Sequence, residues 1–181
     1  MKQPHIVAIG GTLRPQSATG NMLEAALAVA AEKGARTTLM TGDAIAFPNF
    51  EPEDALSNDQ IRHFLDVLRS ADGLIIGSPG YHGSLSGLVK NALDHVELMR
   101  RDDRVYFDGM PVGLIATAGG WQAAVSTLQA LRTIVHALRG WPTPIGIAAN
   151  TGQPGDAIAA CDSQLRLMVG QILYFLDRAR A

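Results

Sequence analysis

The sequence predicts an α/β domain, a three-layer sandwich in which a five-stranded parallel sheet carries helices on both faces. Two observations predict this class: short apolar runs alternate with helical patterns along the whole chain, and glycine-containing or polar turns separate them. Nearly continuous apolar strands are typical of a parallel sheet, because both of its faces are covered. Since crossovers between parallel strands are right-handed, few windings remain, and we infer the strand order 2-1-3-4-5. That order places a ligand crevice at the carboxyl ends of strands one and three.

The individual elements follow from the spacing of apolar residues. Strands are predicted at residues 6–9, 37–40, 74–76, 112–116 and 145–148. Helices are predicted at residues 22–33, 54–71, 86–100, 123–139 and 156–178. Gly34 is the expected C-cap of the first helix, residues 47–52 form a loop because they contain two prolines, and residues 77–81 form a turn.

Length and composition limit the function classes. The chain has 181 residues, 47% of them apolar, and no linker divides it, so residues 1–181 are expected to form a single domain. A formal net charge of −2 and the lack of a basic stripe argue against nucleic-acid binding, and the strong acidity of many electron carriers is missing. The single cysteine, Cys161, cannot form an intramolecular disulfide and reads as a residue of the last helix. No apolar run is long enough for a membrane span and no signal peptide is recognised, so we expect a cytoplasmic protein without membrane contact.

The loop after the first strand carries groups that suit a phosphate. It runs over residues 10–21, directly before a helix, and holds the candidate ligands Thr12, Arg14, Ser17 and Thr19. Hydroxyls, a guanidinium and the free N–H groups at a helix start all stabilise a phosphate dianion. The alternative is an ordinary N-capped helix in which Ser17 or Thr19 is only the cap. The loop lacks G-x-G-x-x-G and G-x-x-x-x-G-K-[ST], so it suits a monophosphate better than a dinucleotide or a P-loop nucleotide.

Two further loops follow the third and fourth strands. Residues 78–87 are rich in small residues, which let the backbone approach a flat ligand, and they include Tyr81 and His82. Residues 117–122 repeat this pattern, with Trp121 beside two glycines. Each loop alone is compatible with a plain α/β turn. Together, at the carboxyl ends of neighbouring strands, they predict a slot for a planar ring with a phosphate tail.

These loops carry a resemblance to a known family. The motifs are Thr12-Leu13-Arg14-x-x-Ser17, then Ser78-Pro79-x-Tyr81-His82, then Ser86-Gly87-x-x-Lys90-Asn91-Ala92-Leu93-Asp94, and finally Ala118-Gly119-Gly120. They resemble the NADPH-dependent FMN reductase family, whose members have the flavodoxin-like fold and include quinone, azo-dye and chromate reductases. The likeness runs from the first strand through Thr151. The middle motif is long and specific, whereas the third is weak by itself.

The resemblance implies a set of FMN ligands. Phosphate ligands would come from the first loop, ring and ribityl contacts from the second, and contacts to the pyrimidine end from the third. In that order they are Thr12, Arg14, Ser17 and Thr19; Pro79, Gly80, Tyr81, His82 and Gly83; and Thr117, Ala118, Gly119 and Gly120. Two positions depart from the pattern: many relatives carry Glu where this chain has Gly80, and Ser is commoner at Thr12.

The resemblance also implies an activity. We expect an NAD(P)H-dependent FMN reductase that takes hydride from NADPH or NADH and passes electrons to free flavin or another acceptor by a ping-pong mechanism. No protein acid or base is required, because the cofactor carries the chemistry, and His82 is only a minor candidate for a general acid. The alternatives are a quinone, azo or chromate reductase that keeps its FMN, and a flavodoxin-like electron carrier without turnover.

The remaining expectations concern partners and single residues. A homodimer or homotetramer is expected from the relatives and from the apolar third and fifth helices, and a flavin-dependent monooxygenase is a possible partner. The histidines show no metal-ligand spacing, so no metal is expected. Lys90 and Asp94 are expected to form an i,i+4 ion pair, and Trp141 is expected in the core. Trp121 is expected either over the flavin or in a subunit contact.

Overall fold

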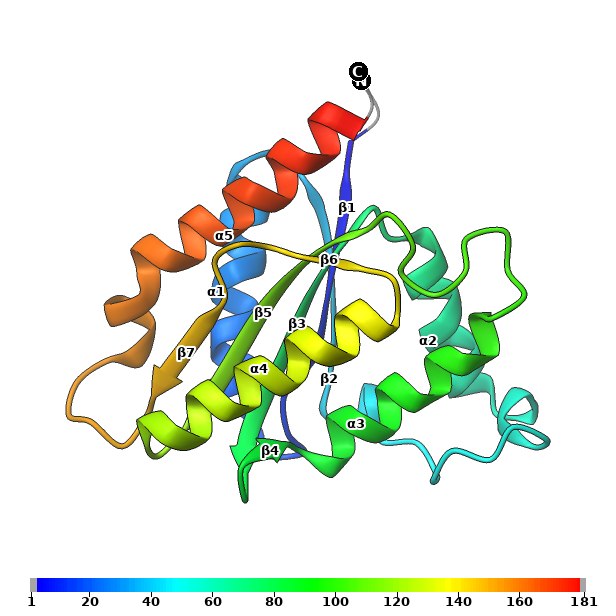
Figure 1. The fold of residues 1–181 in the computed structure, drawn as a ribbon, viewed down its shortest axis with the longest axis horizontal. Helices are drawn as coiled ribbons and strands as arrows, with labels where there is room; N and C mark the ends of the chain where they lie inside the picture. Colours follow the sequence, from blue (N-terminus) through cyan, green and yellow to red (C-terminus); the bar gives the residue numbers. More distant parts are fainter. Residues whose placement is uncertain (1–2, 180–181) are drawn as a thin grey trace.

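The computed structural model describes residues 3–179 and has a parallel sheet between two layers of helices (Figure 1). The strands are β1 (His5–Gly10), β2 (Arg36–Thr41), β3 (Gly73–Tyr81), β5 (Pro111–Ala118), β6 (Trp141–Pro142) and β7 (Ile147–Asn150), with a short β4 (Ser84–Leu85) beside the end of β3. The order β2-β1-β3-β5 continues into β6 and β7, both of which pair with β5 in parallel. The predicted class and the order 2-1-3-4-5 are confirmed, with the fifth strand divided into two short pieces.

Each face of the sheet has its own apolar core. One face is covered by α1 (Ala18–Glu32) and α5 (Ala157–Ala179), whose buried residues include Leu23 and Met168. The other face is covered by α2 (Asp59–Ser70), α3 (Gly87–Asp94) and α4 (Trp121–Ala137), with Phe64 and Phe107 fully buried. Because strands such as β1 and β5 are buried along their full length, they contribute side chains to both cores.

The helix boundaries differ from the predicted ones where a capping side chain sets the start. α2 begins at Asp59, because Asn58 accepts hydrogen bonds from the N–H groups of Gln60 and Ile61. The preceding residues, predicted as helix, form a separate 3₁₀ turn at Ala55–Ser57. The third predicted helix is α3 followed by a 3₁₀ turn at His95–Met99, so the predicted single helix to residue 100 is wrong.

The turn predicted at residues 77–81 is also wrong, because β3 continues through it. β3 pairs with β5 as far as Pro79↔Thr117 and then forms an antiparallel hairpin with β4. His82 (φ 51°) and Gly83 (φ 89°) connect the two strands, so both turn residues lie in the left-handed region that matches the twist of a two-residue hairpin. The hairpin extends the sheet beyond its carboxyl edge.

The last strand and its flanks bring a further correction. The strand predicted at residues 145–148 lies at Ile147–Asn150. Thr143 N still donates to Val112 O of β5, and the Arg132 guanidinium donates to the carbonyls of Thr143 and Pro144 before β7 begins. Trp141 was predicted in the core, but its side chain is 59% exposed and lies beside Phe175, with ring centroids 6.1 Å apart.

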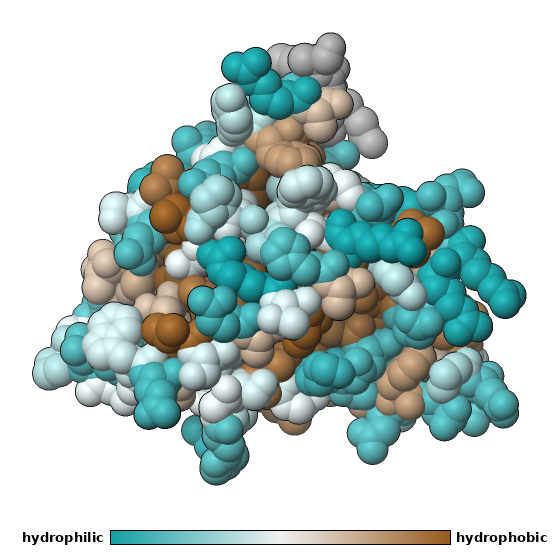
Figure 2. Space-filling model, viewed as in Figure 1, coloured by the Kyte–Doolittle hydropathy of each residue, from teal (hydrophilic) through white to brown (hydrophobic). Residues whose placement is uncertain are grey.

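The surface seen in Figure 2 is mostly hydrophilic, with hydrophobic residues showing in small groups between polar ones. No helix within residues 3–179 is both long and apolar enough to cross a membrane.

Candidate functional site

A cavity of about 370 Å³ lies at the carboxyl ends of β1, β3 and β5, where the predicted loops meet. Its lining is Thr12, Arg14, Pro15, Gln16, Ser17, Ala18, Thr19, Pro79, Gly80, Tyr81, Thr117, Ala118, Gly119 and Thr151. Of the residues predicted for the site, only His82, Gly83 and Gly120 lie outside this lining. The structure thus brings the three loops together, as the strand order requires.

The start of α1 faces this cavity, and some of its first-turn N–H groups are not used by the helix cap. Ser17 is the N-cap, and its Oγ accepts a hydrogen bond of 3.1 Å from Gly20 N. Ser17 is therefore the capping residue that the alternative interpretation required, but the cap uses only one first-turn donor. Ala18 and Thr19 also line the cavity, and their backbone N–H groups have no partner among residues 3–179.

The loop before α1 holds a free cation beside those donors. Thr12 Oγ1 accepts a hydrogen bond of 3.1 Å from Arg14 N and fixes the bend of the loop. The Arg14 side chain is exposed and forms no hydrogen bond or ion pair with any part of the chain that the structure describes. A guanidinium, a hydroxyl and helix-start N–H groups around one cavity form an anion-binding arrangement.

The Thr19 hydroxyl is engaged within the fold, and the predicted contact of Thr19 with a phosphate stays a prediction. The Thr19 side chain is 1% exposed, and its hydroxyl lies 2.6 Å from the hydroxyl of Thr117, which is 4% exposed. This pair joins the start of α1 to the end of β5 beneath the cavity. Both residues line the cavity, but the hydroxyls satisfy each other, as buried hydroxyls must.

Glycines allow the close approach of backbone at two points of the site. A Cβ at Gly10, where φ is 131°, would lie 1.8 Å from the Gly77 carbonyl oxygen, so only glycine permits β1 and β3 to meet here. A Cβ at Gly80 would lie 2.6 Å from Thr127 Oγ1 of α4. Glu at position 80, which we noted in relatives, would not fit this packing of α4 on β3.

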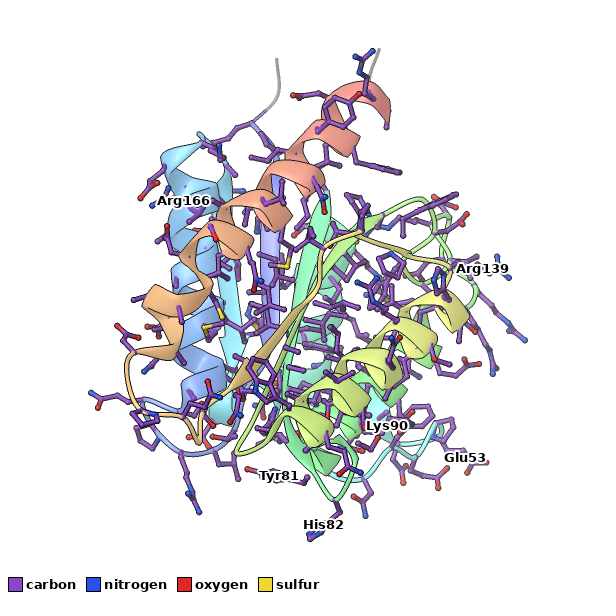
Figure 3. All side chains as sticks on the ribbon, turned by 60° about the vertical axis from the view of Figure 1, so that its left-hand side comes forward. Glu53, Tyr81, His82, Lys90, Arg139 and Arg166 are labelled. Atoms are coloured by element: carbon purple, nitrogen blue, oxygen red, sulfur yellow. The ribbon has the colours of Figure 1, made fainter. Side chains whose placement is uncertain are left out.

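The hairpin places Tyr81 and His82 at the outer edge of the site (Figure 3). Tyr81 lines the cavity and is 53% exposed, which leaves one ring face open to a ligand. His82 is exposed at the tip of the turn, and Figure 3 shows it pointing away from the sheet. Its distance from the cavity gives a general acid role no geometric support.

The third loop is tied to the last strand. Thr151 N donates a hydrogen bond of 2.8 Å to Ala118 O, and a Cβ at Gly152 would lie 2.4 Å from Gly119 O. Thr151 lines the cavity although it was not among the predicted ligands. Its position directly after the last strand is the signal that would have found it, since that end meets the same sheet edge. Nothing comparable distinguishes Pro15, Gln16 or Ala18 in the sequence.

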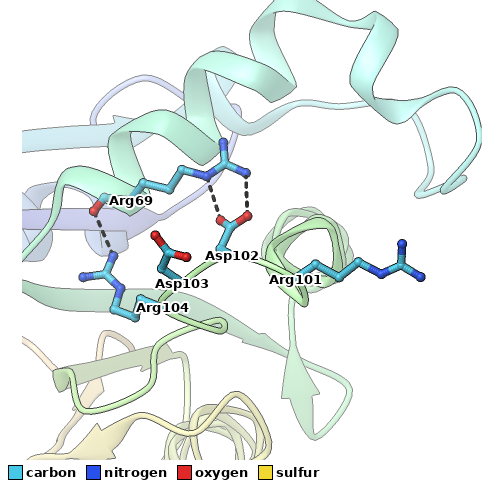
Figure 4. Close-up of a pocket in the computed structure, with 5 residues that line it drawn as sticks. All are labelled: Arg69, Arg101, Asp102, Asp103 and Arg104. Atoms are coloured by element: carbon cyan, nitrogen blue, oxygen red, sulfur yellow. Dashed lines mark hydrogen bonds and ion pairs between the residues drawn. The ribbon is translucent and has the colours of Figure 1, made fainter.

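A second charged cavity, of about 480 Å³, lies at the opposite edge of the sheet (Figure 4). It is lined by Arg69, Arg101, Asp102, Asp103 and Arg104. Arg69 Nε donates to Asp102 Oδ2 at 2.7 Å, and this hydrogen bond raises the pKa of Arg69. Arg104 donates to the carbonyls that end α2, whereas its burial lowers its pKa. Arg69, Asp102 and Arg104 are used within the fold in this way, so we assign the cavity a structural role.

Single-residue expectations can be compared with the contacts observed. Lys90 Nζ and Asp94 Oδ1 are 2.6 Å apart, which confirms the predicted i,i+4 pair. Cys161 lies in α5, as predicted; it is also buried, and burial raises the pKa of its thiol. His95 is buried, with Nδ1 2.8 Å from Asn91 O.

Comparison with known proteins places the chain in a family. A model of the NADPH-dependent FMN reductase family matches residues 4–154. An FMN-dependent NADPH-azoreductase of Staphylococcus haemolyticus is 41% identical over 127 residues, which are 66% of this chain and 64% of the relative. The matched part thus spans less than two thirds of that relative's length.

Solved structures agree with this assignment. An apo NADH:FMN oxidoreductase is 25% identical, with a TM-score of 0.69 over 96% of this chain and 89% of the other. A flavodoxin, WrbA-like protein of Agrobacterium tumefaciens shares the fold at 17% identity, with a TM-score of 0.64 over 96% of this chain and 98% of the other. The fold is therefore flavodoxin-like. The polar cavity at the carboxyl edge of this sheet lies within the matched residues, and the chain belongs to the NADPH-dependent FMN reductase family.

Proposed function

We propose that the protein is an FMN-dependent reductase that oxidises NADPH or NADH and passes the electrons to a small-molecule acceptor. The observation that supports this function best is the 370 Å³ cavity, in which an unpaired guanidinium and free helix-start N–H groups adjoin a half-exposed tyrosine and bare backbone. A phosphate suits the first set of groups and a planar ring suits the second. Family membership and the name of the azoreductase relative support the same cofactor and donor.

The residues present fit FMN. Arg14, the Ser17 hydroxyl proton and the N–H groups of Ala18 and Thr19 would hold the phosphate, because each can donate toward the cavity. The hydroxyls of Thr19 and Thr117 would hold the start of α1 against β5 and so position these phosphate donors. The predicted contacts of His82, Gly83 and Gly120 remain predictions, since these residues lie outside the cavity lining.

The isoalloxazine ring would lie between the β3 end and the third loop. Buried Pro79 and Ala118, with half-buried Gly80, offer a wall of small residues, and Tyr81 offers an exposed ring at the entrance. Bound FMN supplies hydride acceptance and electron transfer, so the protein needs to bind, orient and shield it. Backbone N–H groups of the third loop would stabilise negative charge on the ring by hydrogen bonding.

The first experiment is a titration of FMN with an arginine variant. Arg14→Ala should weaken FMN binding about tenfold or more, because a charge-assisted hydrogen bond to phosphate is lost. The matched control is Arg36→Ala, which removes an exposed arginine at the start of β2, at the far edge of the sheet. Flavin fluorescence quenching gives the affinity, and circular dichroism verifies the fold. Equal FMN affinity in Arg14→Ala and in wild type would discard the phosphate assignment.

Acceptor specificity separates the two enzymatic versions of this proposal. Oxidation of NADPH or NADH that requires added FMN indicates a flavin reductase, whereas protein-retained FMN with faster turnover on quinones or azo dyes indicates a detoxifying reductase. The name of the staphylococcal relative favours an azo acceptor. Bound FMN without oxidation of either nucleotide would indicate an electron carrier.

Assembly and location are part of the same proposal. We propose a single-domain chain that forms a homodimer or homotetramer in the cytoplasm, with a flavin-dependent monooxygenase as one candidate recipient of reduced flavin. Light scattering tests the assembly, and a monomer at working concentration would remove it from the proposal.

A further inference from the structure

A separate cavity of about 400 Å³ lies along the outer edge of β7. Its lining is Trp121, Gly146, Ala148, Ala149, Asn150, Gln153, Ala157, Ala160, Cys161 and Gln164. β7 pairs with β5 on one side, and no strand within residues 3–179 pairs with its other side. α4 and α5 cover opposite faces of the sheet, and the cavity is lined by residues of β7, of α5 and of the start of α4.

The lining of this cavity is uncharged, in contrast to the anion-binding cavity described above. Neither Lys, Arg, Asp nor Glu contributes to it. Trp121 is 53% exposed, so its indole presents a large flat surface to the opening. The side-chain amides of Gln153 and Gln164 are exposed and have no hydrogen-bond partner in the described part of the chain. These features match a neutral planar ring with hydrogen-bonding groups on its edge.

The open edge of β7 adds backbone donors and acceptors. Alternate residues of an edge strand turn both N–H and C=O outward, where they can pair with a ligand as they would with another strand. The lining residues on β7 include Ala148 and Ala149, whose side chains are small. A heteroaromatic base with a donor and an acceptor side by side can pair with such an edge while it stacks on an indole.

The two cavities are neighbours across a thin wall. Gly119 and Thr151 line the first, whereas Trp121 and Asn150 line the second. The wall consists of the third loop and the segment after β7, joined by the hydrogen bond from Thr151 N to Ala118 O. A ligand with a ring at each end could place one ring in each cavity, and the linker between its rings would need to cross only these two segments.

We propose that the cavity beside β7 binds the adenine ring of the donor nucleotide, and that this ring stacks on the Trp121 indole. The inference rests on the proposed function, since the nicotinamide end of the same molecule must reach the flavin cavity. An uncharged lining suits the base itself rather than its phosphates. Trp121 then acts as a binding residue for the unreactive end of the nucleotide.

Tryptophan fluorescence tests the cavity without turnover. The chain has only two tryptophans, so Trp141→Phe leaves Trp121 as the sole reporter and Trp121→Phe leaves Trp141. Tryptophan is excited at a wavelength that adenosine does not absorb. In the FMN-loaded protein, added adenosine should then quench the fluorescence of Trp121 saturably and leave the fluorescence of Trp141 unchanged. Absence of saturable quenching of Trp121, or equal quenching of both tryptophans, would overturn the inference.

Kinetics with a truncated donor test the same site during turnover. Reduced nicotinamide mononucleotide carries the reactive ring without adenosine, so Trp121→Ala should leave its KM unchanged while raising the KM for NADH about tenfold. Trp121→Phe should restore most of the loss, and Trp141→Ala, which removes an equally exposed indole at the other end of the sheet, should change neither KM. Equal effects of Trp121→Ala on both donors would contradict adenine binding. If no reduced nucleotide is oxidised at all, the proposed function fails, and the adenosine titration still decides on the cavity.

Discussion

The contact between Gly80 and Thr127 gives a quantitative prediction about the packing of α4 on β3. A Cβ at Gly80 would lie 2.6 Å from Thr127 Oγ1, 3.0 Å from Ala123 O and 3.3 Å from Ala118 Cβ. Overpacking of this kind lowers the free energy of unfolding by about 1–3 kcal/mol. Replacing glycine by alanine also restricts the unfolded chain, which raises the free energy of unfolding by about 0.4–1 kcal/mol. Gly80→Ala should therefore destabilise the protein by about 1–2 kcal/mol, which lowers Tm by roughly 2–8 °C for a chain of this length.

The same contact predicts that the destabilisation depends on residue 127. Thr127 Oγ1 is buried and has no hydrogen-bond partner within residues 3–179, so Thr127→Ala removes an unsatisfied polar atom as well as the closest steric contact. In a Thr127→Ala background, Gly80→Ala should cost at least about 1 kcal/mol less than in the wild type.

Urea denaturation of the wild type, both single variants and the double variant measures this coupling. Gly87→Ala is the matched control, because a Cβ there meets nothing within 4 Å, and it should not lower stability. Wild-type stability in Gly80→Ala, or the same loss of stability in both backgrounds, would refute the steric argument.

Three other regions give predictions of their own. Thr19→Val should destabilise by about 1–3 kcal/mol because it leaves the Thr117 hydroxyl unsatisfied, and the double Thr19→Val/Thr117→Val variant should recover most of this loss in a thermal melt. Arg104→Ala should lower the unfolding free energy by roughly 2 kcal/mol, since it removes the guanidinium that donates to the carbonyls of Leu68, Arg69 and Ala71, yet FMN affinity in a fluorescence titration should not change. His82→Asn should retain the turnover rate while stabilising the hairpin by a few tenths of a kcal/mol, because Asn adopts a left-handed turn more readily; a large drop in the turnover rate would instead support the general acid role. Burial raises the pKa of Cys161, so the folded state holds its thiol proton more tightly and stability should decline as pH rises above the ordinary thiol range, and unchanged urea midpoints between pH 8 and pH 10 would contradict this.

The sequence predicted the features that depend on local pattern and on the general rules of parallel sheets. Alternation of strands and helices predicted the layers, and the crossover rule left few windings, from which the strand order was inferred. Because the carboxyl ends of parallel strands share one edge, the sequence alone assigned the loops after β1, β3 and β5 to a common site.

Two of the errors or open choices came from non-local contacts. Pro79 and Gly80 read as a turn, yet β1 pairs with β3 only as far as Gly77, so at Pro79 one side of β3 has no strand beside it. A proline there forfeits no ladder hydrogen bond, and the strand continues. Similarly, sequence alone could not choose between Ser17 and Thr19 as the cap of α1. The choice depends on Thr117, which is 98 residues away from Thr19 and engages its hydroxyl.

Gly80 shows how a departure from the family pattern can be interpreted physically. A missing Glu suggests at first a lost ligand contact, but the space for any side chain at this position is already filled by Thr127 and the Ala123 carbonyl. Gly80 and Thr127 therefore depend on each other. Gly80 has no side chain and the Thr127 hydroxyl has no hydrogen-bond partner within residues 3–179, and this allows α4 to lie close to the end of β3. That proximity places the start of α4, with Trp121, next to the cavity at the carboxyl ends of β1, β3 and β5. A chain with Glu at this position would need α4 farther from β3, and the cavity beside Trp121 would then differ in shape.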